Sequence, residues 1–287
     1  MDQMFNIEVL CMKMNQKKFW KNFISLFILF ILGFAAFLPL YWMVVTALKP
    51  PTLVLKFPPE ILPKNPTLVN FKIFFARPYI FRWTLNSAIV AGSVTIARII
   101  LCAMAGYAIA KKSFPGSKLF FWIYIASMMV PSQVTLIPLY IIVSNLKMIN
   151  TYWGLIIPSI AAPFGVFLMR QFMVTLPDEI IEAAKIDGAG EFYTFWKIVF
   201  PIAKPAVAVL GIFTFVNEWN DFLWPLIITN TTAMKTLQAG LVMIREEIPM
   251  EYALHMASAT FAAIPMLVVF FAFQKYFLKG ITVGAIK

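Results

Sequence analysis

The chain has 287 residues, of which 61% are hydrophobic and only 13% are charged, and its formal net charge is +11. A soluble domain of this length could not bury so much apolar surface, so the composition excludes a soluble protein and indicates an integral membrane protein. The basic residues flank apolar segments, where they set topology and contact lipid headgroups, so membrane lipid is an expected partner and nucleic acid is not.

Residues 1–21 contain several lysines and are expected to form a cytoplasmic N-terminal tail. The uncharged run that follows extends to Lys49, which is longer than the apolar core of a cleaved signal peptide and indicates a retained span. The later apolar spans are each long enough to cross roughly 30 Å of hydrocarbon at about 1.5 Å per residue. They lie near residues 84–109, 119–143, 152–173, 203–228 and 257–278. The sequence therefore predicts an all-α membrane protein with six transmembrane helices.

The positions of the basic residues predict the orientation. Lys111 and Lys112 follow the second span, and Lys275 and Lys279 lie at the end of the sixth. Both places are on the same side of the membrane as the N-terminal lysines, whereas many basic residues of the other side fall in one long loop. Because cytoplasmic loops are enriched in Lys and Arg, both termini are expected in the cytoplasm.

Prolines mark the long loop and two of the spans. The loop of about residues 47–82 is expected to lack regular helix and to form an extended cap over the outer mouth, because its prolines cannot continue one. These are Pro50, Pro51, Pro58, Pro59, Pro63 and Pro66. Prolines inside the third and fourth spans predict kinks, which are either hinges or curved walls. They are Pro131, Pro138, Pro158 and Pro163.

Polar residues interrupt the outer half of the fifth span, and Gln133 in the third span is a further candidate for solute contact. Either the fifth-span residues make polar contacts between helices or end the span early, or they form a polar wall that hydrogen-bonds a hydrophilic solute. Asn217 and Asp221 are four residues apart and are expected on one helix face. The candidate residues of the fifth span are Asn217, Glu218, Trp219, Asn220 and Asp221.

Arg98 is a charged residue within the second span. At about 1.5 Å per residue, it lies nearer the cytoplasmic side, whereas Glu218 lies about 20 Å from the inner face. The two residues are therefore displaced in depth and need not be partners. Arg98 is expected to extend towards the membrane surface or to tie helices together.

The sequence predicts no catalytic residue and no metal site. His255 is the single histidine, while Cys11 and Cys102 lie in the N-terminal tail and in an apolar span, so neither a histidine cluster nor a disulfide is expected. No phosphate-binding loop of the form G-x-x-x-x-G-K-[ST] and no nucleophile–base set occur. The chain is therefore not expected to be an enzyme or to bind a cofactor. If ATP drives transport, ATP and Mg must be bound by a separate ATPase.

A short polar stretch, LPDEIIEAAKIDGAG at residues 176–190, separates the fourth and fifth spans. Pro177 suits the first turn of a helix, and the acids that follow favour the positive end of its dipole. Gly188 supplies the left-handed conformation that commonly ends a helix. A second helix is expected from Glu191 to about Phe200.

This helix–turn–helix is expected to dock on another protein, because it presents acids and a smooth alanine face outside the apolar spans. The candidate docking residues are Asp178, Glu179, Glu182, Ala183, Ala184, Asp187 and Gly188.

The stretch resembles the EAA loop of the membrane permease subunits of binding-protein-dependent ABC importers. That loop has the form EAA, three residues, glycine, and a run that ends in proline; here EAAKIDG at 182–188 precedes Pro201 and Pro205. Within that superfamily the chain resembles the carbohydrate-uptake branch and its maltose-type six-span subunits. The supporting stretches are LKPP (48–51), PKNPTLVNF (63–71), NSAIVAG (86–92), MVPSQVTLIPLY (129–140), NTYWGLIIP (150–158), FGVFLMRQF (164–172), WNDFLWPL (219–226) and FQKYFLKGITVGAIK (273–287).

The resemblance implies a permease domain over residues 22–278 of a bacterial inner-membrane importer for a sugar or oligosaccharide. Its coupling loop, residues 174–200, would dock an ABC ATPase, with Glu182, Ala183, Ala184 and Gly188 as docking residues. The cytoplasmic C-terminal tail, residues 279–287, is similar to tails that reach the ATPase dimer. The implied partners are a second homologous permease, a dimer of ABC ATPase subunits and an extracytoplasmic solute-binding protein.

Two other functions are considered. The chain is either a permease for a non-sugar polar solute such as a glycerol phosphate, or an ion-coupled secondary transporter that uses Glu218, Asp221 and Arg98. The second would need inverted repeats and broken midplane helices, and neither is evident in the sequence. Residues 1–11 have no recognised counterpart in the family, so Met12 or Met14 is an alternative start.

Overall fold

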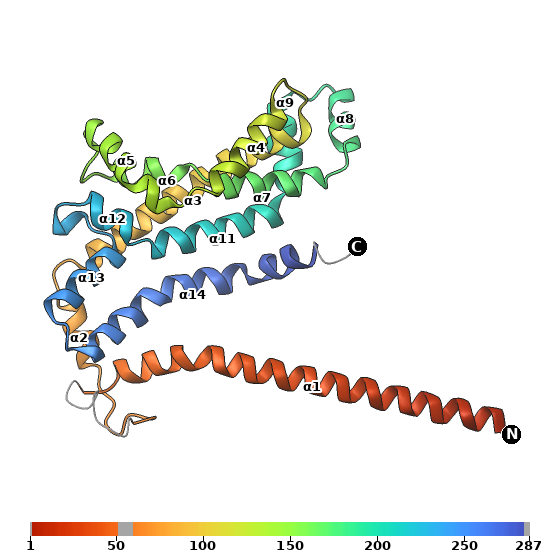
Figure 1. Ribbon diagram of the computed structural model, residues 1–287, viewed down its shortest axis with the longest axis horizontal. Coiled ribbons are helices and arrows are strands. Elements are labelled where there is room, and N and C mark those ends of the chain that lie inside the picture. The colour runs from red at the N-terminus through yellow and green to blue at the C-terminus, as the bar shows by residue number, and fades with distance from the viewer. Residues whose placement is uncertain (1, 51–59, 284–287) are drawn as a thin grey trace. The chain divides into compact units, whose positions relative to one another are not determined.

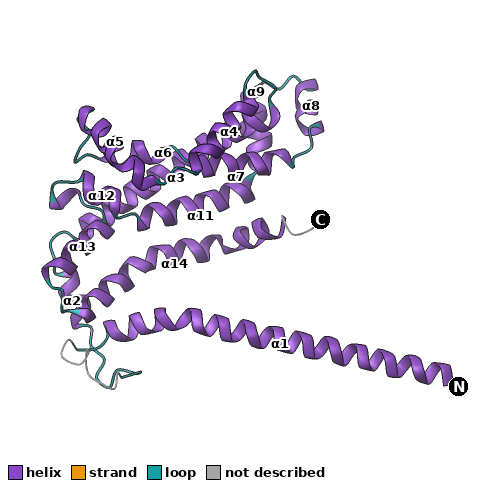
Figure 2. Cartoon of the chain, viewed as in Figure 1, coloured by secondary structure: helices purple, strands orange, loops and turns teal. Residues whose placement is uncertain are grey.

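The computed structural model describes residues 2–50 and 60–283, with side chains for residue 20 and for residues 22–50 and 60–274. All regular elements in these ranges are helices, and no strand occurs among them (Figure 2). The predicted all-α class is confirmed. The chain divides into two compact units, residues 1–73 with 251–260, and residues 74–250 with 261–287.

The first unit contains one long helix, α1, which runs from Asp2 to Ala47. Its segment Asn22–Ala47 is long and apolar enough to cross a membrane, with a mean hydropathy of 2.6, as the uncharged run predicts. The predicted tail, residues 1–21, contributes the first turns of this helix rather than a separate segment. The side chain of Asn70 terminates α1, because its amide donates hydrogen bonds to the carbonyl oxygens of Ala47 and Lys49 at 2.7 and 2.8 Å.

Asn70 belongs to a short helix, α2, Val69–Phe75. The prediction that the loop of residues 47–82 contains no regular helix is therefore wrong for its second half. The reason is that α2 begins three residues after Pro66, beyond the last proline of the run, where nothing prevents helical hydrogen bonding. Pro51, Pro58 and Pro59, three of the six prolines that predict the extended cap, lie outside the described residues.

The second unit is organised around α3, Ile80–Lys111. It packs against α7, Pro163–Val174, and α11, Lys204–Asn220 (Figure 1). Glycines at the crossing allow the backbones to approach closely. A Cβ atom on Gly106 of α3 would lie 2.7 Å from the Cβ of Met169, and one on Gly165 of α7 would lie 2.7 Å from the sulfur of Cys102.

The third and fourth predicted spans are each two helices. In the third, α4 (Ser117–Met128) and α5 (Ser132–Asn145) meet at 102°. In the fourth, α6 (Tyr152–Ile160) meets α7 at 42°. The predicted kinks are thus confirmed at Pro131 and Pro163, which stand at the starts of α5 and α7, the position that proline favours. Pro138 and Pro158 lie inside helices.

A continuous helical segment, Glu191–Ile202, precedes α11 and meets it at 78°. It comprises α9 (Glu191–Tyr193), a π-helical part (Thr194–Val199) and α10 (Phe200–Ile202), which confirms the helix predicted to begin at Glu191. The fifth span is interrupted between α11 and α12, Leu223–Ile228. The polar loop that follows contains α13, Leu237–Glu247, before α14, Tyr252–Val283.

Within the part of the chain that the structure describes, three helices are individually long and apolar enough to cross a membrane, at Asn22–Ala47, Ile80–Lys111 and Tyr252–Gln274. The number rises to as many as six if each of the three bent pairs counts as one span. The predicted six spans are compatible with this helix inventory, but the third and fourth are not the uninterrupted helices that their apolar lengths suggest.

Candidate functional site

The predicted docking helix is present as α8, Glu179–Ile186, which follows α7 directly. In Figure 1 it lies at the end of the second unit opposite α12 and α13. Gly188 has a φ of 76°, and the N–H of Ala189 donates to the carbonyl of Ala184 at 2.9 Å. The helix therefore ends at a left-handed glycine as predicted.

The two faces of α8 have different environments. Ile181 and Ala184 are buried against the chain's own core, whereas Glu179, Glu182 and Ala183 are exposed. The predicted alanine face is therefore split, because Ala184 packs inwards and only Ala183 is accessible to a partner. Asp187 and Gly188 are exposed at the end of the helix.

Two consecutive lysines at the end of α3 hold the residues on either side of α8. The ammonium of Lys111 lies 2.6 Å from the carboxylate of Asp178 and donates to the carbonyl of Leu176 at 2.5 Å. Lys112 pairs with Glu191. Burial alone would favour the neutral amine of Lys112, but its hydrogen bond to Glu191 and its charge interactions with Tyr107 and Glu191 outweigh this effect and raise the lysine pKa. Asp178, predicted to meet a partner protein, is thus paired within the chain.

Exposed apolar residues beside α8 were missed by the sequence analysis. Ile186 is 86% exposed, Phe192 is 71% exposed and Tyr193 is 58% exposed. A helical projection contains a signal for the first, because Ile186 is five residues from Ile181 and cannot share its inward face. Exposed large apolar side chains next to acids are typical of a protein–protein contact.

At the other end of this unit, a cleft of about 200 Å³ lies between the start of α5, the end of α6 and the junction of α11 with α12. Its polar lining consists of Ser132, Gln133, Thr135, Ser159 and Asp221, and the ring of Trp224 adds an aromatic wall. Gln133 and Asp221, predicted as solute contacts from two separate spans, are therefore brought together. Hydroxyl, amide and carboxylate groups of this kind donate to and accept from polar solutes.

Asp221 is positioned by the break in the fifth span. Its backbone is extended, with φ −66° and ψ 124°, and its Oδ1 accepts a hydrogen bond from the N–H of Leu223 at 3.2 Å. The prediction that Asn217 and Asp221 share a helix face is wrong, because α11 ends at Asn220. The helix therefore ends early, as one of the two interpretations has it, and its end lines a polar cleft. Hydrogen bonding of a solute by this segment stays a prediction.

The other fifth-span candidates do not line this cleft. Trp219 is buried, its indole N–H donates to the carbonyl of Ala262 at 2.9 Å, and it stacks on Phe215. The amide of Asn220 donates to the carbonyl of Val216 at 2.9 Å. Asn217 is exposed elsewhere on α11. Contact of these residues with a solute remains a prediction.

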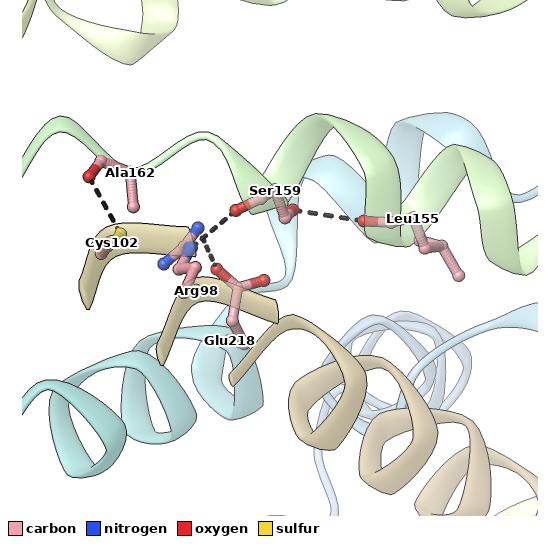
Figure 3. A network of polar contacts seen from close by, with 6 residues as sticks. All are labelled: Arg98, Cys102, Leu155, Ser159, Ala162 and Glu218. Atoms are coloured by element: carbon pink, nitrogen blue, oxygen red, sulfur yellow. Dashed lines mark hydrogen bonds and ion pairs between the residues drawn. The ribbon is translucent and has the colours of Figure 1, made fainter. Parts of the chain in front are cut away.

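Arg98 and Glu218 form an ion pair, with 2.7 Å between Nη2 and Oε1 (Figure 3). Their side chains are only 15% and 9% exposed. The depth count that separated them is wrong, because it measured Arg98 from the outer end of a span starting near residue 84, whereas α3 runs from Ile80 to Lys111. Counted from Lys111, Arg98 lies about 20 Å along its helix, the same distance as Glu218 from the start of α11. Arg98 Nε also donates to the carbonyl of Ser159 at 2.6 Å, so the expectation that Arg98 ties helices together is confirmed.

A second group of polar contacts, which was not predicted from the sequence, lies around Asn86 in α3. Its amide donates to the carbonyls of Ala233 and Lys235 at 2.8 Å, and its Oδ1 accepts from the hydroxyl of Tyr152 at 2.6 Å. The signal in the sequence is an asparagine inside an apolar span, a residue that is costly there unless it is satisfied. Asn86 thereby holds the segment before α13 against α3.

Among the residues that the structure describes, no group of three or more His, Cys, Asp or Glu side chains is arranged to hold a metal ion. Cys102 is buried and has a free thiol, while the side chain of Cys11 lies outside the described residues. The arrangement therefore presents two features with functional chemistry: an exposed acidic and apolar helix at one end and a polar cleft at the other.

Comparisons with known proteins identify the class of these features. The family described as "Binding-protein-dependent transport system inner membrane component" matches residues 99–283. The chain is 32% identical over 259 residues to the arabinooligosaccharides transport system permease protein AraQ of Halalkalibacterium halodurans, covering 89% of this chain and 93% of the relative. It is 36% identical over 261 residues to the sn-glycerol-3-phosphate transport system permease protein UgpE of Salmonella typhi, covering 88% and 92%.

A solved structure has the same fold. It is the crystal structure of a bacterial ABC transporter involved in the import of the acidic polysaccharide alginate, and one of its chains matches with a TM-score of 0.78. The match covers 89% of this chain and 96% of that chain at 20% sequence identity.

Proposed function

This chain belongs to the binding-protein-dependent transport system inner membrane components, and we propose on that premise that it is a permease subunit of an ATP-driven ABC importer for a sugar or oligosaccharide. The observation that supports the solute class is the cleft lined by Gln133, Asp221 and hydroxyl groups. A sugar presents many hydroxyl groups, and these donors and acceptors match the cleft lining.

A glycerol phosphate is the second candidate solute, because UgpE is also a relative. The charge of the cleft favours the sugar. Asp221 would repel a phosphate, and no lysine or arginine lines the cleft among the described residues. The guanidinium of Arg98, which contacts the cleft residue Ser159, is already paired with Glu218 at 2.7 Å. Phosphate recognition in proteins usually relies on unneutralised cations of this type.

A second, homologous permease subunit is the proposed partner within the membrane. A cleft of about 200 Å³ is smaller than the roughly 300–1,000 Å³ of typical ligand sites, so one chain does not enclose an oligosaccharide. An extracytoplasmic binding protein would deliver the solute to the mouth that the two permeases form. Both termini are proposed to be cytoplasmic in a bacterial inner membrane. The last residues of the proposed C-terminal tail, 284–287, lie outside the described residues.

The ATPase is proposed to bind at α8, within the loop of residues 174–200. The exposed acids Glu179, Glu182 and Asp187, with Ala183 and Gly188, offer charge and close approach, and Ile186 offers an apolar contact. Asp178 and Ala184 would contribute indirectly, because they hold α8 to the rest of the chain. ATP and Mg would be bound by two copies of that ATPase rather than by this chain.

The solute class is tested by reconstituting the chain with its sibling permease, its ATPase and its binding protein in proteoliposomes. ATP-dependent uptake of labelled arabinooligosaccharides, other glycans and sn-glycerol-3-phosphate is then compared. We expect uptake of a glycan and little uptake of the phosphate ester. Uptake of glycerol phosphate alone would contradict the sugar assignment, while ATP-independent uptake driven by an ion gradient would contradict the ABC mechanism.

A further inference from the structure

The break between α6 and α7 is held by two side chains of α3. A helix leaves its last carbonyl groups without partners, and here the carbonyl of Ser159, near the end of α6, accepts from Arg98 Nε at 2.6 Å. One turn further along α3, the thiol of Cys102 donates to the carbonyl of Ala162 at 3.7 Å. Arg98 and Cys102 thus lie on one face of α3 and bracket the bend (Figure 3).

The same guanidinium joins this bend to the end of α11. Its Nη2 binds Glu218, which lies three residues before Asp221. Ser159 and Asp221 both line the cleft, so the ion pair is linked to one lining residue by a hydrogen bond and to the other by three residues of chain. Because both side chains are largely removed from water, loss of either partner would leave a charge without compensation.

Two continuous paths lead from Arg98 to the docking helix. α7 begins at the bend and leads directly into α8. α3 itself extends from Arg98 to Lys111, about 20 Å along the helix axis, and Lys111 binds Asp178 at the start of α8. The guanidinium of Arg98 is therefore linked to α8 in two ways, through the α6–α7 bend and along α3.

We propose that Arg98 and Glu218 are positioning residues that set the angle between α6 and α7 and so connect occupancy of the cleft to the position of α8. The proposal rests on the import function proposed above. It adds the residues that transmit occupancy of the cleft to the docking helix. A solute that contacts Asp221 and Ser159 acts on the ends of α11 and α6, which the guanidinium holds together. Coupling of this kind requires an element with two arrangements that both sites bias, and the proposal assigns this role to the α6–α7 bend.

The experiment uses the complete importer in proteoliposomes and compares ATP hydrolysis with empty and with solute-loaded binding protein. The single variants are Arg98→Lys, which keeps a cation opposite Glu218 but loses Nε, and Glu218→Gln, which keeps an acceptor but loses the charge. We expect each to lower the stimulation by loaded binding protein about fivefold or more, within the usual range of allosteric coupling. The matched control is Glu247→Gln, which breaks the exposed Arg77–Glu247 pair of 2.8 Å and should leave the stimulation unchanged.

A double variant, Arg98→Met with Glu218→Leu, separates positioning from stability. It leaves no buried charge without a partner, so assembly and melting temperature should recover towards those of the wild type. If the pair positions the bend, stimulation stays low in this assembled complex. If stimulation returns with assembly, the pair is structural only and the proposal is overturned.

Two further outcomes are also decisive. If the double variant does not assemble, Arg98→Lys decides the proposal, because it retains the ion pair and loses only the bond to Ser159; normal stimulation would overturn it. If the wild-type complex is stimulated only by a binding protein loaded with glycerol phosphate, the sugar assignment fails instead. The positioning test then proceeds with that solute.

Discussion

At the residue scale, Asp221 both ends a helix and lines the candidate solute cleft. Its backbone ends α11, its Oδ1 accepts from the N–H of Leu223 at 3.2 Å, and its side chain lines the cleft beside Ser159. Asparagine in its place would retain an acceptor for Leu223 and lose only the charge. Asn217, also polar and on the same segment, is exposed outside the cleft.

We expect Asp221→Asn to reduce uptake about tenfold while the complex still assembles. A hydrogen bond to a charged acceptor contributes about 1.5–3 kcal/mol, and about 1.4 kcal/mol corresponds to a factor of ten. Uptake by proteoliposomes and the melting temperature of the complex are the measurements, with Asn217→Ala as the comparison. Equal loss of uptake in both variants would place the solute along α11 rather than in the cleft. Loss of assembly in Asp221→Asn would make the residue structural.

At the scale of elements, α8 and α3 form a connected pair. Lys111 and Lys112 at the end of α3 bind Asp178 and Glu191 on either side of α8, so the docking helix is fixed at both flanks. Its outward face remains free of these contacts and presents Glu182. α3 in turn packs closely on α7 through glycines.

We expect Glu182→Lys to abolish co-purification of the ATPase without removing the permease from the membrane. The proposed partner surface is basic, and like charges in an interface cost several kcal/mol. Glu246→Lys on α13 is the control, because the same charge reversal there is exposed at the other end of the unit. Retention of the ATPase by Glu182→Lys, measured as ATPase recovered per permease, would remove α8 from the interface.

We expect Gly106→Val to lower the melting temperature of the complex by several degrees. A Cβ at this position would lie 2.7 Å from Met169 Cβ and 2.8 Å from the backbone nitrogen of Arg170. Overpacking of this kind costs about 1–3 kcal/mol. Gly92→Val on the same helix is the matched control, since a Cβ there meets nothing within 4 Å. Equal melting temperatures for the two variants would show that α3 and α7 separate without cost.

At the scale of the whole molecule, transport is proposed for this chain and ATP hydrolysis for a separate ATPase. This assignment determines which activities the purified chain should have. The sequence contains no phosphate-binding loop with a Gly-Lys pair. We therefore expect the purified chain to show no saturable ATP binding, whereas the complex with the ATPase does. Equilibrium binding of a fluorescent ATP analogue measures both. Saturable binding by the isolated chain would contradict the separation of transport and hydrolysis.

Local pattern was sufficient to predict the membrane class, the main apolar helical segments and the docking segment. Apolar runs determine spans, and the acids from Asp178 onwards and Gly188 mark the start and end of α8 through interactions within a few residues. Pro177 lies just before α8 rather than in its first turn, because the helix begins at Glu179. The kinks at Pro131 and Pro163 follow from the missing N–H of proline, which is equally local. The family resemblance rested on the same short stretches, and the family match supports it.

Only the tertiary structure decided which polar residues meet. Whether Arg98 pairs with Glu218 depends on how α3 and α11 pack against each other, and whether Asp221 reaches the same cleft as Gln133 depends on the break after α11. The inward packing of Ile181 depends likewise on core residues distant in sequence, such as Tyr107 and Phe195. Contacts between residues some 60–120 positions apart result from helix crossings and bends, and those are set by packing of the whole unit rather than by periodicity along one span.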